Sequence, residues 1–304
     1  MDRFEAMRNL IVAVDEGSLS AAARRANVPL PTLSRRIADL EAHLGTQLLI
    51  RTSRRLHLTE AGEDFVSAAR RLLDDLDDAE RAAAGEYRAP RGELVVSAPI
   101  TFGRLNVAPI VHQFLTAYPD VSVRLLLSDR LALLAEEHID AAIRVGHLAD
   151  SELVARKVGE VRWIICASPD YLDRMGMPVL PAEVRQHQCI SLEGLPSPRT
   201  WIFQDGNQTL AVPIQPRLTI STAEAAVDAA IAGIGLARVV SYQAVSAIAD
   251  GRLVPVLRDY WQPAMPVHVV HGPRRYQPLK LRSFLDFAIP RLSQTISAVG
   301  RLLV

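Results

Sequence analysis

Small, hydroxyl and guanidinium side chains share one face of a helix predicted near the start of the chain. The helix spans residues 31–44, and Pro31, Ser34 and Arg35 point outward from it, with Thr32 nearer the flank. Such a face fits the major groove of DNA, where an arginine can pair with guanine. It could equally be an ordinary solvated surface, so the helix alone does not decide. The opposite face is an apolar stripe of Leu33, Ile37, Leu40 and Leu44.

The segment before this helix predicts how it is presented. A short helix over residues 20–26 precedes it, and the four intervening residues give the spacing of a helix-turn-helix. Small side chains at Ala22 and Ala26 would let the two helices cross closely. Together these features favour the DNA-binding interpretation over a solvated surface.

The segment after the helix predicts a basic hairpin. Gly45 ends the helix, and residues 47–51 and 56–59 have the character of two short strands. Between them lies Thr52-Ser53-Arg54-Arg55. Arginines at a hairpin tip beside a recognition helix would contact phosphates or a minor groove, as in a winged helix.

The charge of the chain is balanced overall but not along its length. The 304 residues carry 34 basic and 34 acidic side chains, a balance that by itself predicts no nucleic-acid or membrane partner. From Arg24 to His57, however, seven arginines accompany two acids, which gives +5. From Glu60 to Pro90, four arginines accompany nine acids, which gives −5. The zero is therefore a cancellation, and the basic segment coincides with the predicted winged helix-turn-helix.

The acidic segment is itself predicted to form one long helix. Thr59 can cap its N-terminus, and apolar residues recur along it every three or four positions. Such a stripe normally packs on the chain's own core. Because the opposite face is nearly all charged and Pro90-Arg91-Gly92 follows as a linker, we favour a dimerising coiled coil, which would place two recognition helices on one duplex. The stripe consists of Phe65, Ala69, Leu72, Leu76, Ala79 and Ala83.

From Glu93 onward, apolar segments of strand length alternate with helical segments. This alternation predicts a mostly parallel sheet covered by helices. Over two hundred residues are many for one such layer, so we expect two lobes around a cleft. The predicted strands are 94–98, 121–127, 140–145, 163–167, 188–192, 217–220, 235–239, 253–256 and 267–271. The predicted helices are 104–118, 130–137, 169–175, 223–232, 242–248 and one from Leu279 to the C-terminal region.

Three junctions between strands and helices are candidates for a ligand site. In α/β sheets, ligands bind beyond the carboxyl ends of strands, where helix N-termini present free N–H groups. The alternative is that polar residues at such junctions only cap helices, and we expect this of at least one of the three. The junctions contain Pro99, Ile100, Thr101 and Phe102, then Arg144, Gly146 and His147, then Ser221 and Thr222.

The N-terminal motifs resemble those of LysR-type transcriptional regulators, in order and in spacing. The resemblance implies a dimeric winged-helix protein with a linker helix. The resemblance departs at Val28-Pro29-Leu30-Pro31, where the family usually has a Ser or Thr cap followed by a polar residue. A base contact from Leu30 would therefore be apolar, for instance to a thymine methyl. The motifs are GSLSAAARR at 17–25, LSRRI at 33–37, LE at 40–41, LG at 44–45, LL at 48–49, RT at 51–52 and LTEAG at 58–62.

The C-terminal part is similar, more loosely, to the effector-binding region of the same family. That similarity implies a two-lobed fold like that of periplasmic substrate-binding proteins, with a small inducer held between the lobes. Arg238 stands where relatives usually carry an apolar residue, and it is either a salt-bridged surface group or a cleft cation for an acidic effector. The matching tracts are DAAIRVG at 140–146, SP at 168–169, YL at 171–172, Trp201, DG at 205–206, AGIGLA at 232–237 and GRLV at 251–254.

Two other classes of protein are weighed against a regulator. An enzyme of this architecture would carry a signature such as G-x-S-x-G, G-x-x-x-x-G-K, H-E-x-x-H or paired C-x-x-C, and the sequence contains none of these. An exported solute-binding protein would need a signal peptide, whereas the first turn is acidic, and would leave residues 1–90 unexplained. The only two cysteines, Cys166 and Cys189, lie within apolar stretches, which favours a cytoplasmic protein. No apolar run approaches the roughly 18 residues of a membrane span, so no membrane partner is expected.

The sequence therefore predicts a DNA-binding regulator of transcription under the control of a small effector, with no enzymatic activity, cofactor or metal. Its fold class is α plus α/β: a winged helix-turn-helix (1–59), a linker and dimerisation helix (60–90) and a two-lobed effector-binding domain (91–304). The expected partners are a double-stranded DNA operator, a small effector and further copies of the chain, with family habit suggesting a tetramer. The predicted DNA-binding residues are Leu30, Pro31, Thr32, Ser34, Arg35, Arg36, Arg51, Ser53, Arg54 and Arg55. The predicted effector-binding residues are those of the three junctions together with Arg238.

Overall fold

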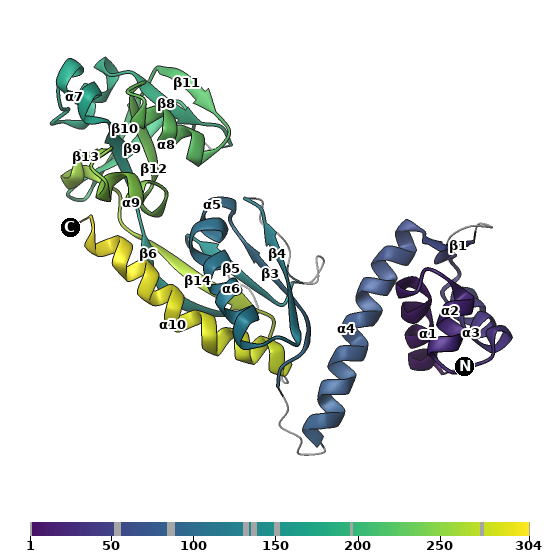
Figure 1. The fold of residues 1–304 in the computed structure, drawn as a ribbon. Coiled ribbons are helices and arrows are strands. Elements are labelled where there is room, and N and C mark those ends of the chain that lie inside the picture. Colours follow the sequence, from purple (N-terminus) through teal and green to yellow (C-terminus); the bar gives the residue numbers. More distant parts are fainter. Residues whose placement is uncertain are drawn as a thin grey trace. The chain divides into compact units, whose positions relative to one another are not determined.

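In the computed structural model the chain folds as two units, Met1–Glu93 and Leu94–Val304 (Figure 1). The structure describes residues 2–51, 56–83, 89–129, 134, 139–148, 153–194, 197–273 and 277–303.

Three helices of the N-terminal unit share one apolar core. They are α1 (Arg3–Asp15), α2 (Leu19–Arg25) and α3 (Leu30–Leu44). The carboxylate of Asp2 caps α1 by accepting from the amide of Phe4 at 3.0 Å, and the hydroxyl of Ser18 caps α2. The predicted stripe of α3 is buried at Leu33, Ile37 and Leu40, but Leu44 is 39% exposed because it ends the helix. Gly45 follows with a left-handed φ of 68°.

A short hairpin and a long helix complete this unit. Strands β1 (Leu49–Arg51) and β2 (Leu56–Leu58) pair antiparallel, and α4 (Glu60–Ala83) follows. The carboxylate of Glu41 accepts from the amides of Leu48 and Leu49 at 2.8 and 3.0 Å and so ties the hairpin to α3. Thr59 caps α4 as expected, since its hydroxyl accepts from the amide of Gly62 at 3.0 Å. It also donates to the Gln47 carbonyl at 2.7 Å.

Helix α4 packs along α1 on one face and is open on another (Figure 1). Val66, Ala69 and Leu73 are buried, and ion pairs join Arg8 to Asp77 and Arg70 to Asp15. Leu72, in contrast, is 52% exposed. The predicted apolar stripe is thus divided between the unit's own core and solvent. The side chains of its last two members, Ala79 and Ala83, lie outside the described residues.

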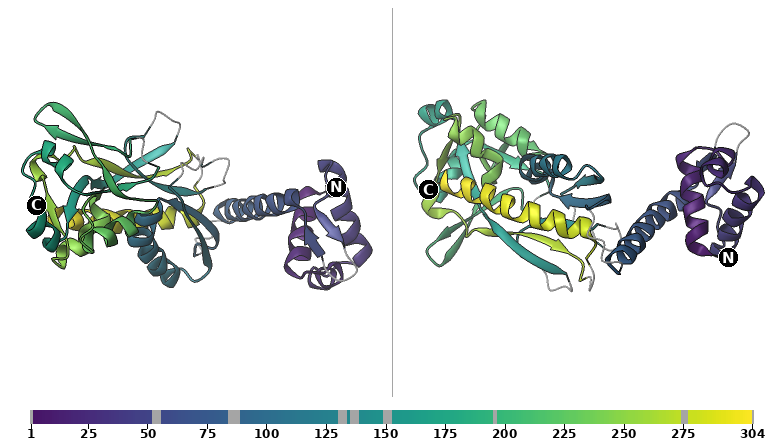
Figure 2. Two further views of the ribbon diagram at one scale, coloured as in Figure 1. Left: turned by 90° about the horizontal axis from the view of Figure 1, so that it is seen from above. Right: turned by 60° about the horizontal axis from the view of Figure 1, so that its bottom comes forward.

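The C-terminal unit contains two five-stranded sheets, shown from two sides in Figure 2. The first has the order β4-β3-β5-β14-β6. Helices α6 and α10 cover one face of it, where the rings of Phe114 and Phe284 meet edge to face at 5.3 Å. Its strands are β3 (Gly92–Ala98), β4 (Val121–Leu127), β5 (Ala141–Val145), β6 (Val154–Val161) and β14 (Met265–His271). Its helices are α5 (Ile100–Phe102), the π-helical η1 (Gly103–Val107), α6 (Ala108–Ala117) and α10 (Leu279–Arg301).

The second sheet has the order β11-β8-β12-β7-β13, and a hairpin of β9 and β10 stands beside it. Helix α8 and helix α9 pack against this sheet. Its strands are β7 (Trp163–Ala167), β8 (Cys189–Leu192), β11 (Pro216–Ile220), β12 (Leu236–Val240) and β13 (Val254–Val256), and the hairpin is β9 (Thr200–Asp205) with β10 (Gln208–Pro213). The accompanying helices are α7 (Pro169–Met175), η2 (Pro181–Gln186), α8 (Ala223–Ile231), α9 (Ser241–Ala249) and η3 (Arg258–Tyr260).

Both sheets are mixed, and the prediction of a mostly parallel sheet needs one correction: one strand in each sheet, β14 or β7, runs against its neighbours. In the first, β3 and β5 are parallel, whereas β14 runs antiparallel to β5 and β6. In the second, β8 is parallel to β11 and β12, whereas β7 runs antiparallel to β12 and β13. The chain passes between the sheets from β6 to β7 and from β13 to β14. The strands that it enters, β7 and β14, are the ones that run against their neighbours. Alternation along the sequence does not reveal the direction of such strands.

Three strands were not predicted, and one predicted helix cannot be compared. Strand β6 carries Arg156, Lys157 and Glu160 on its exposed side, so it lacks the apolar run that the sequence analysis relied on. Strands β9 and β10 form a local hairpin around Gly206. The helix predicted over 130–137 lies outside the described residues, apart from residue 134.

Candidate nucleic-acid interface and ligand cleft

Helix α3 presents to solvent the residues that the sequence analysis placed on its outer face. Pro31 and Arg35 are exposed, and Thr32 and Ser34 are half-buried. Leu30, the first residue of the helix, is 41% exposed, and Pro29 before it makes no side-chain cap. The buried stripe on the opposite face fixes the rotation of α3 about its axis. The outer face is consequently held outward by the core of the unit.

Arg36 differs from its neighbour Arg35. Its Nη1 lies 2.8 Å from a carboxylate oxygen of Glu5 in α1, and its side chain is 27% exposed. This ion pair joins α3 to α1. Arg35 keeps its charge on the exposed face.

A hollow of about 610 Å³ beside the start of α3 adds residues that the sequence analysis did not assign to the site. Arg24 was counted in the basic segment but not placed in the interface. In the structure Arg25 pairs with Glu16 at 2.6 Å, whereas no described acid lies within ion-pair distance of Arg24. Asn27 takes a left-handed φ of 53° in the turn between the helices. The hollow is lined by Ser20, Ala23, Arg24, Asn27, Val28, Pro29 and Leu30.

The predicted wing is described only in part. The backbone of Arg51 belongs to β1, and its side chain lies outside the described residues. Ser53, Arg54 and Arg55 lie outside the described residues. The strands β1 and β2 pair from Leu49 with Leu58 to Arg51 with Leu56.

In the C-terminal unit, the junction at 99–102 and the start of α8 lie together. Pro99 precedes α5, and the amide of Ile100 donates to a carboxylate oxygen of Asp129 at 3.0 Å. Arg104 Nε lies 3.6 Å from a carboxylate oxygen of Glu224, which is in the first turn of α8 directly after Ser221 and Thr222. Elements of the first and second sheets therefore meet at these two predicted junctions.

Aromatic and hydroxyl side chains shape this meeting point. Thr101 is 6% exposed, and the buried ring of Phe102 meets that of Tyr242 edge-on at 5.1 Å. Burial, assisted by the charges of Asp129 and Glu224, raises the pKa of Tyr242, so its phenol stays protonated. Thr222 makes no side-chain hydrogen bond to cap α8. The alternative that polar residues at these junctions only cap helices therefore does not explain the threonine at position 222.

The junction after β5 is held by β14. The amide of Gly146 donates to the carbonyl of Pro266 at 2.8 Å, and Arg144 pairs in register with His268. Arg144 is 8% exposed and His147 is exposed. Burial, and then the charges of Lys157 and His147, lower the pKa of His268. Basic side chains of Arg144, His147, Lys157 and His268 thus gather at this end of the first sheet, where Lys157 is paired with Glu160.

Arg238 has partners of its own on β12. Its Nη2 donates to the amide oxygen of Gln262 at 2.6 Å, and its guanidinium carbon lies 4.6 Å from the ring centre of Trp163. Burial lowers the pKa of Arg238 to about 10. Among the residues that the structure describes, an amide and an indole, not a carboxylate, thus contact this guanidinium.

Comparison with known proteins identifies the family. Residues 4–63 match the family described as bacterial regulatory helix-turn-helix protein, lysR family, and residues 88–293 match the LysR substrate binding domain. This chain belongs to the LysR family. It is a DNA-binding transcriptional regulator with an effector-binding domain, and members of this family are regulators, not enzymes.

Individual relatives resemble this LysR-type regulator along most of its length. An HTH-type transcriptional repressor of Pseudomonas aeruginosa is 33% identical over 95% of this chain and 92% of its own. The structure of CrgA, a LysR-type transcriptional regulator from Neisseria meningitidis, aligns with 31% identity and a TM-score of 0.62 over 95% of this chain and 98% of that one. The full-length structure of AphB, a Vibrio cholerae virulence activator, aligns with 30% identity and a TM-score of 0.60 over 94% and 98%.

Among the residues that the structure describes, no three or more His, Cys, Asp or Glu side chains are grouped so that they could hold a metal ion. Cys166 and Cys189 are fully buried, and burial raises the pKa of each thiol to about 12. Within the described helices, none is long and apolar enough to cross a membrane.

Proposed function

We propose that this regulator binds its operator through α3, with the exposed face of that helix in the major groove. The observation that carries the proposal is the division of α3 into a buried stripe and an outer face with an exposed Arg35. On this proposal Pro31, Thr32, Ser34 and Arg35 contact base edges, and Leu30 adds an apolar contact. Arg36 contributes by holding α3 against Glu5.

Contacts to the DNA backbone are proposed on both sides of α3. Arg24 stands at the hollow beside the start of the helix and has the exposed charge that a phosphate requires. On the other side, Arg51, Ser53, Arg54 and Arg55 of the wing would contact phosphates or the minor groove. Removal of Arg24 or Arg54 should reduce the slope of affinity against salt by about one on every DNA sequence.

We infer that the effector binds at the junctions between the two sheets. Thr101, Ser221 and Thr222 supply hydroxyl groups there, and Pro99, Ile100 and Phe102 supply apolar surface. The end of β5, with Arg144, Gly146 and His147, belongs to the same proposal. Arg238 does not, because Gln262 and Trp163 already engage its guanidinium.

Self-association through α4 is proposed from its open face. Leu72 is 52% exposed on a helix whose other face already packs on α1, so a second α4 could cover it. The dimer would present two α3 helices to one duplex, and the tetramer suggested by family habit would pair two such dimers. We propose the same division of labour as expected from the sequence: DNA binding by residues 1–59, dimerisation by 60–90 and effector response by 91–304. The cytoplasm is the proposed location because the operator is there.

Selection of DNA by the purified protein tests the proposed function. The full chain is incubated with random DNA fragments, with and without a panel of small metabolites, and the bound fragments are sequenced. We expect enriched fragments with two related half-sites and a change in binding with at least one metabolite. Thr101→Ala should remove the response to that metabolite and leave operator binding without it intact. If no fragment is enriched over its starting abundance, the proposed sequence-specific function is refuted.

A further inference from the structure

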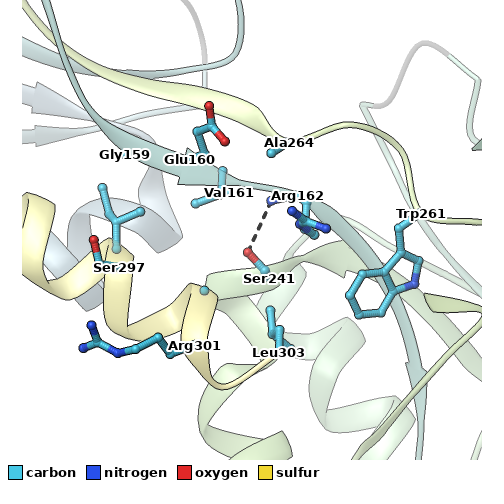
Figure 3. Close-up of a pocket in the computed structure, with 12 residues that line it drawn as sticks. Gly159, Glu160, Val161, Arg162, Ser241, Trp261, Ala264, Ser297, Arg301 and Leu303 are labelled. Carbon is cyan, nitrogen blue, oxygen red and sulfur yellow. Dashed lines mark hydrogen bonds between the residues drawn. The ribbon is translucent and has the colours of Figure 1, made fainter. Parts of the chain in front are cut away.

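A cavity lies in the C-terminal unit between β6, α9 and α10. It has a volume of about 710 Å³, within the range of small-molecule sites. The end of β6, the start of α9, the segment after η3 and the last turn of α10 form its walls (Figure 3). None of the residues that line it belongs to the three junctions proposed for the effector.

One side of the cavity is apolar and firmly built. Val161 and Ile296 are buried in the shared core, at 2% and 3% exposure. Helix α10 approaches β6 so closely that a Cβ on Gly159 would lie 2.6 Å from Cγ2 of Ile296. The indole of Trp261 is fixed by a hydrogen bond of 3.0 Å from its Nε1 to the carbonyl of Val256. An apolar or aromatic group would find a preformed surface here.

The opposite side carries polar and cationic groups. Ser241 is 2% exposed, its Oγ accepts from the amide of Arg162 at 3.3 Å, and its amide donates to the Arg162 carbonyl at 2.8 Å. Because the Ser241 hydroxyl only accepts in these contacts, its proton is free to donate to a ligand. Ser241 is also the first residue of α9, so the positive end of that helix lies at the cavity.

The charges around the cavity favour an anion. No described carboxylate lies within ion-pair distance of Arg162, which stands above Ser241, or of Arg301 on the far rim (Figure 3). The one acid of the lining, Glu160, is already paired with Lys157 at 2.5 Å, and that hydrogen bond lowers the pKa of Glu160. The charge of Arg162 makes a smaller contribution to this lowering, so Lys157, outside the lining, provides most of the compensation of Glu160.

We propose that this cavity binds a small organic anion with an apolar body, such as an aryl carboxylate. Its carboxylate would lie between the guanidinium of Arg162 and the hydroxyl of Ser241, and its ring would pack against Trp261. Arg301 would add charge at the rim. The site would be a second ligand site of the regulator, distinct from the proposed effector cleft.

Titration of the full chain with 4-fluorophenylacetate, followed by fluorine NMR, tests this proposal. We expect saturable binding that the neutral analogue 4-fluorophenylacetamide does not reproduce. Arg162→Ala should weaken binding at least about tenfold, as loss of a charge-assisted contact does. Ser241→Ala should weaken it by a smaller factor. Arg124→Ala, which removes an exposed arginine on β4, is the matched control and should leave binding unchanged.

Comparison with the effector cleft completes the test. Thr101→Ala should leave the binding of 4-fluorophenylacetate unchanged, even if it removes the response to an effector. The proposal is overturned if the amide binds as well as the acid, or if Arg162→Ala has no more effect than Arg124→Ala. It is also overturned if Thr101→Ala abolishes binding, or if no binding is seen up to about 10 mM, which is weaker than a millimolar site. Circular dichroism of each variant confirms that it folds.

Discussion

Substitution of Gly62 by alanine should destabilise the DNA-binding unit, although it replaces a helical glycine. A Cβ at this position would lie 2.1 Å from the carbonyl oxygen of Leu48 and 3.0 Å from Cδ2 of Leu58. The Leu48 carbonyl cannot easily retreat, because it accepts from the Thr59 amide and the Leu48 amide is bound by Glu41. The start of α4 would have to move by about 0.9 Å merely to reach a contact of 3.0 Å.

The expected size of the effect follows from three contributions. Overpacking of a tight contact costs about 1–3 kcal/mol. A shift of α4 also weakens the Thr59 cap, which is worth about 1 kcal/mol. Against these, alanine gains up to about 1 kcal/mol over glycine in a helix. The free energy of unfolding of the N-terminal unit should therefore fall by about 2 kcal/mol.

Hydrogen exchange measured by mass spectrometry on the full chain can isolate this unit. Amides of α1, α3 and α4 should exchange faster in Gly62→Ala, whereas tryptophan fluorescence should be unchanged because all three tryptophans lie in the C-terminal unit. Gly300→Ala is the matched control, since Gly300 is helical and nothing lies within 4 Å of its would-be Cβ. That variant should be at least as stable as the parent. If the amides of the N-terminal unit exchange no faster in Gly62→Ala than in the parent, the inferred close contact between α4 and the hairpin is wrong.

Three further predictions concern other parts of the chain. Leu72→Glu should weaken self-association more than about tenfold in sedimentation experiments. Met177→Glu, at a similarly exposed position in the other unit, should leave it unchanged. If both variants self-associate equally well, α4 is not part of the interface. Burial lowers the pKa of His187, so protonation favours the unfolded chain and stability should fall as the pH drops through the ordinary histidine pKa of about 6.5. The urea midpoint followed by tryptophan fluorescence should show this fall, and His187→Gln should reduce it. A fall of the same size in His187→Gln would exclude His187 as its source. Cys166 and Cys189 should react with a thiol reagent only after unfolding in urea, and rapid reaction of the native protein would contradict their burial.

Local patterns were sufficient to predict much of the N-terminal unit. The spacing of Leu33, Ile37 and Leu40 determines which face of α3 is buried, and that face is buried in the structure. Gly45 and Thr59 act on their own neighbourhoods, so the helix end and the helix cap could be inferred from residue type. Each of these features depends on residues a few positions apart.

Features that depend on distant residues could not be predicted in this way. Arg35 and Arg36 are adjacent and of one type, but only Arg36 meets Glu5, which the fold of α1 brings to it. Arg24 and Arg25 differ likewise through Glu16. The direction of β14 and the cavity around Ser241 depend on segments more than a hundred residues apart in the chain. The sequence names these residues but does not reveal which distant residues contact them in the fold.

The central claim, sequence-specific DNA binding through the outer face of α3, is tested most directly by Arg35→Ala. Its affinity is compared with that of the parent by fluorescence anisotropy, on a fragment enriched by selection and on random DNA at the same salt concentration. We predict a loss of about 1–3 kcal/mol on the enriched fragment, as expected for a bidentate guanine contact, and a clearly smaller loss on random DNA. Equal losses on both DNAs would contradict base recognition by α3.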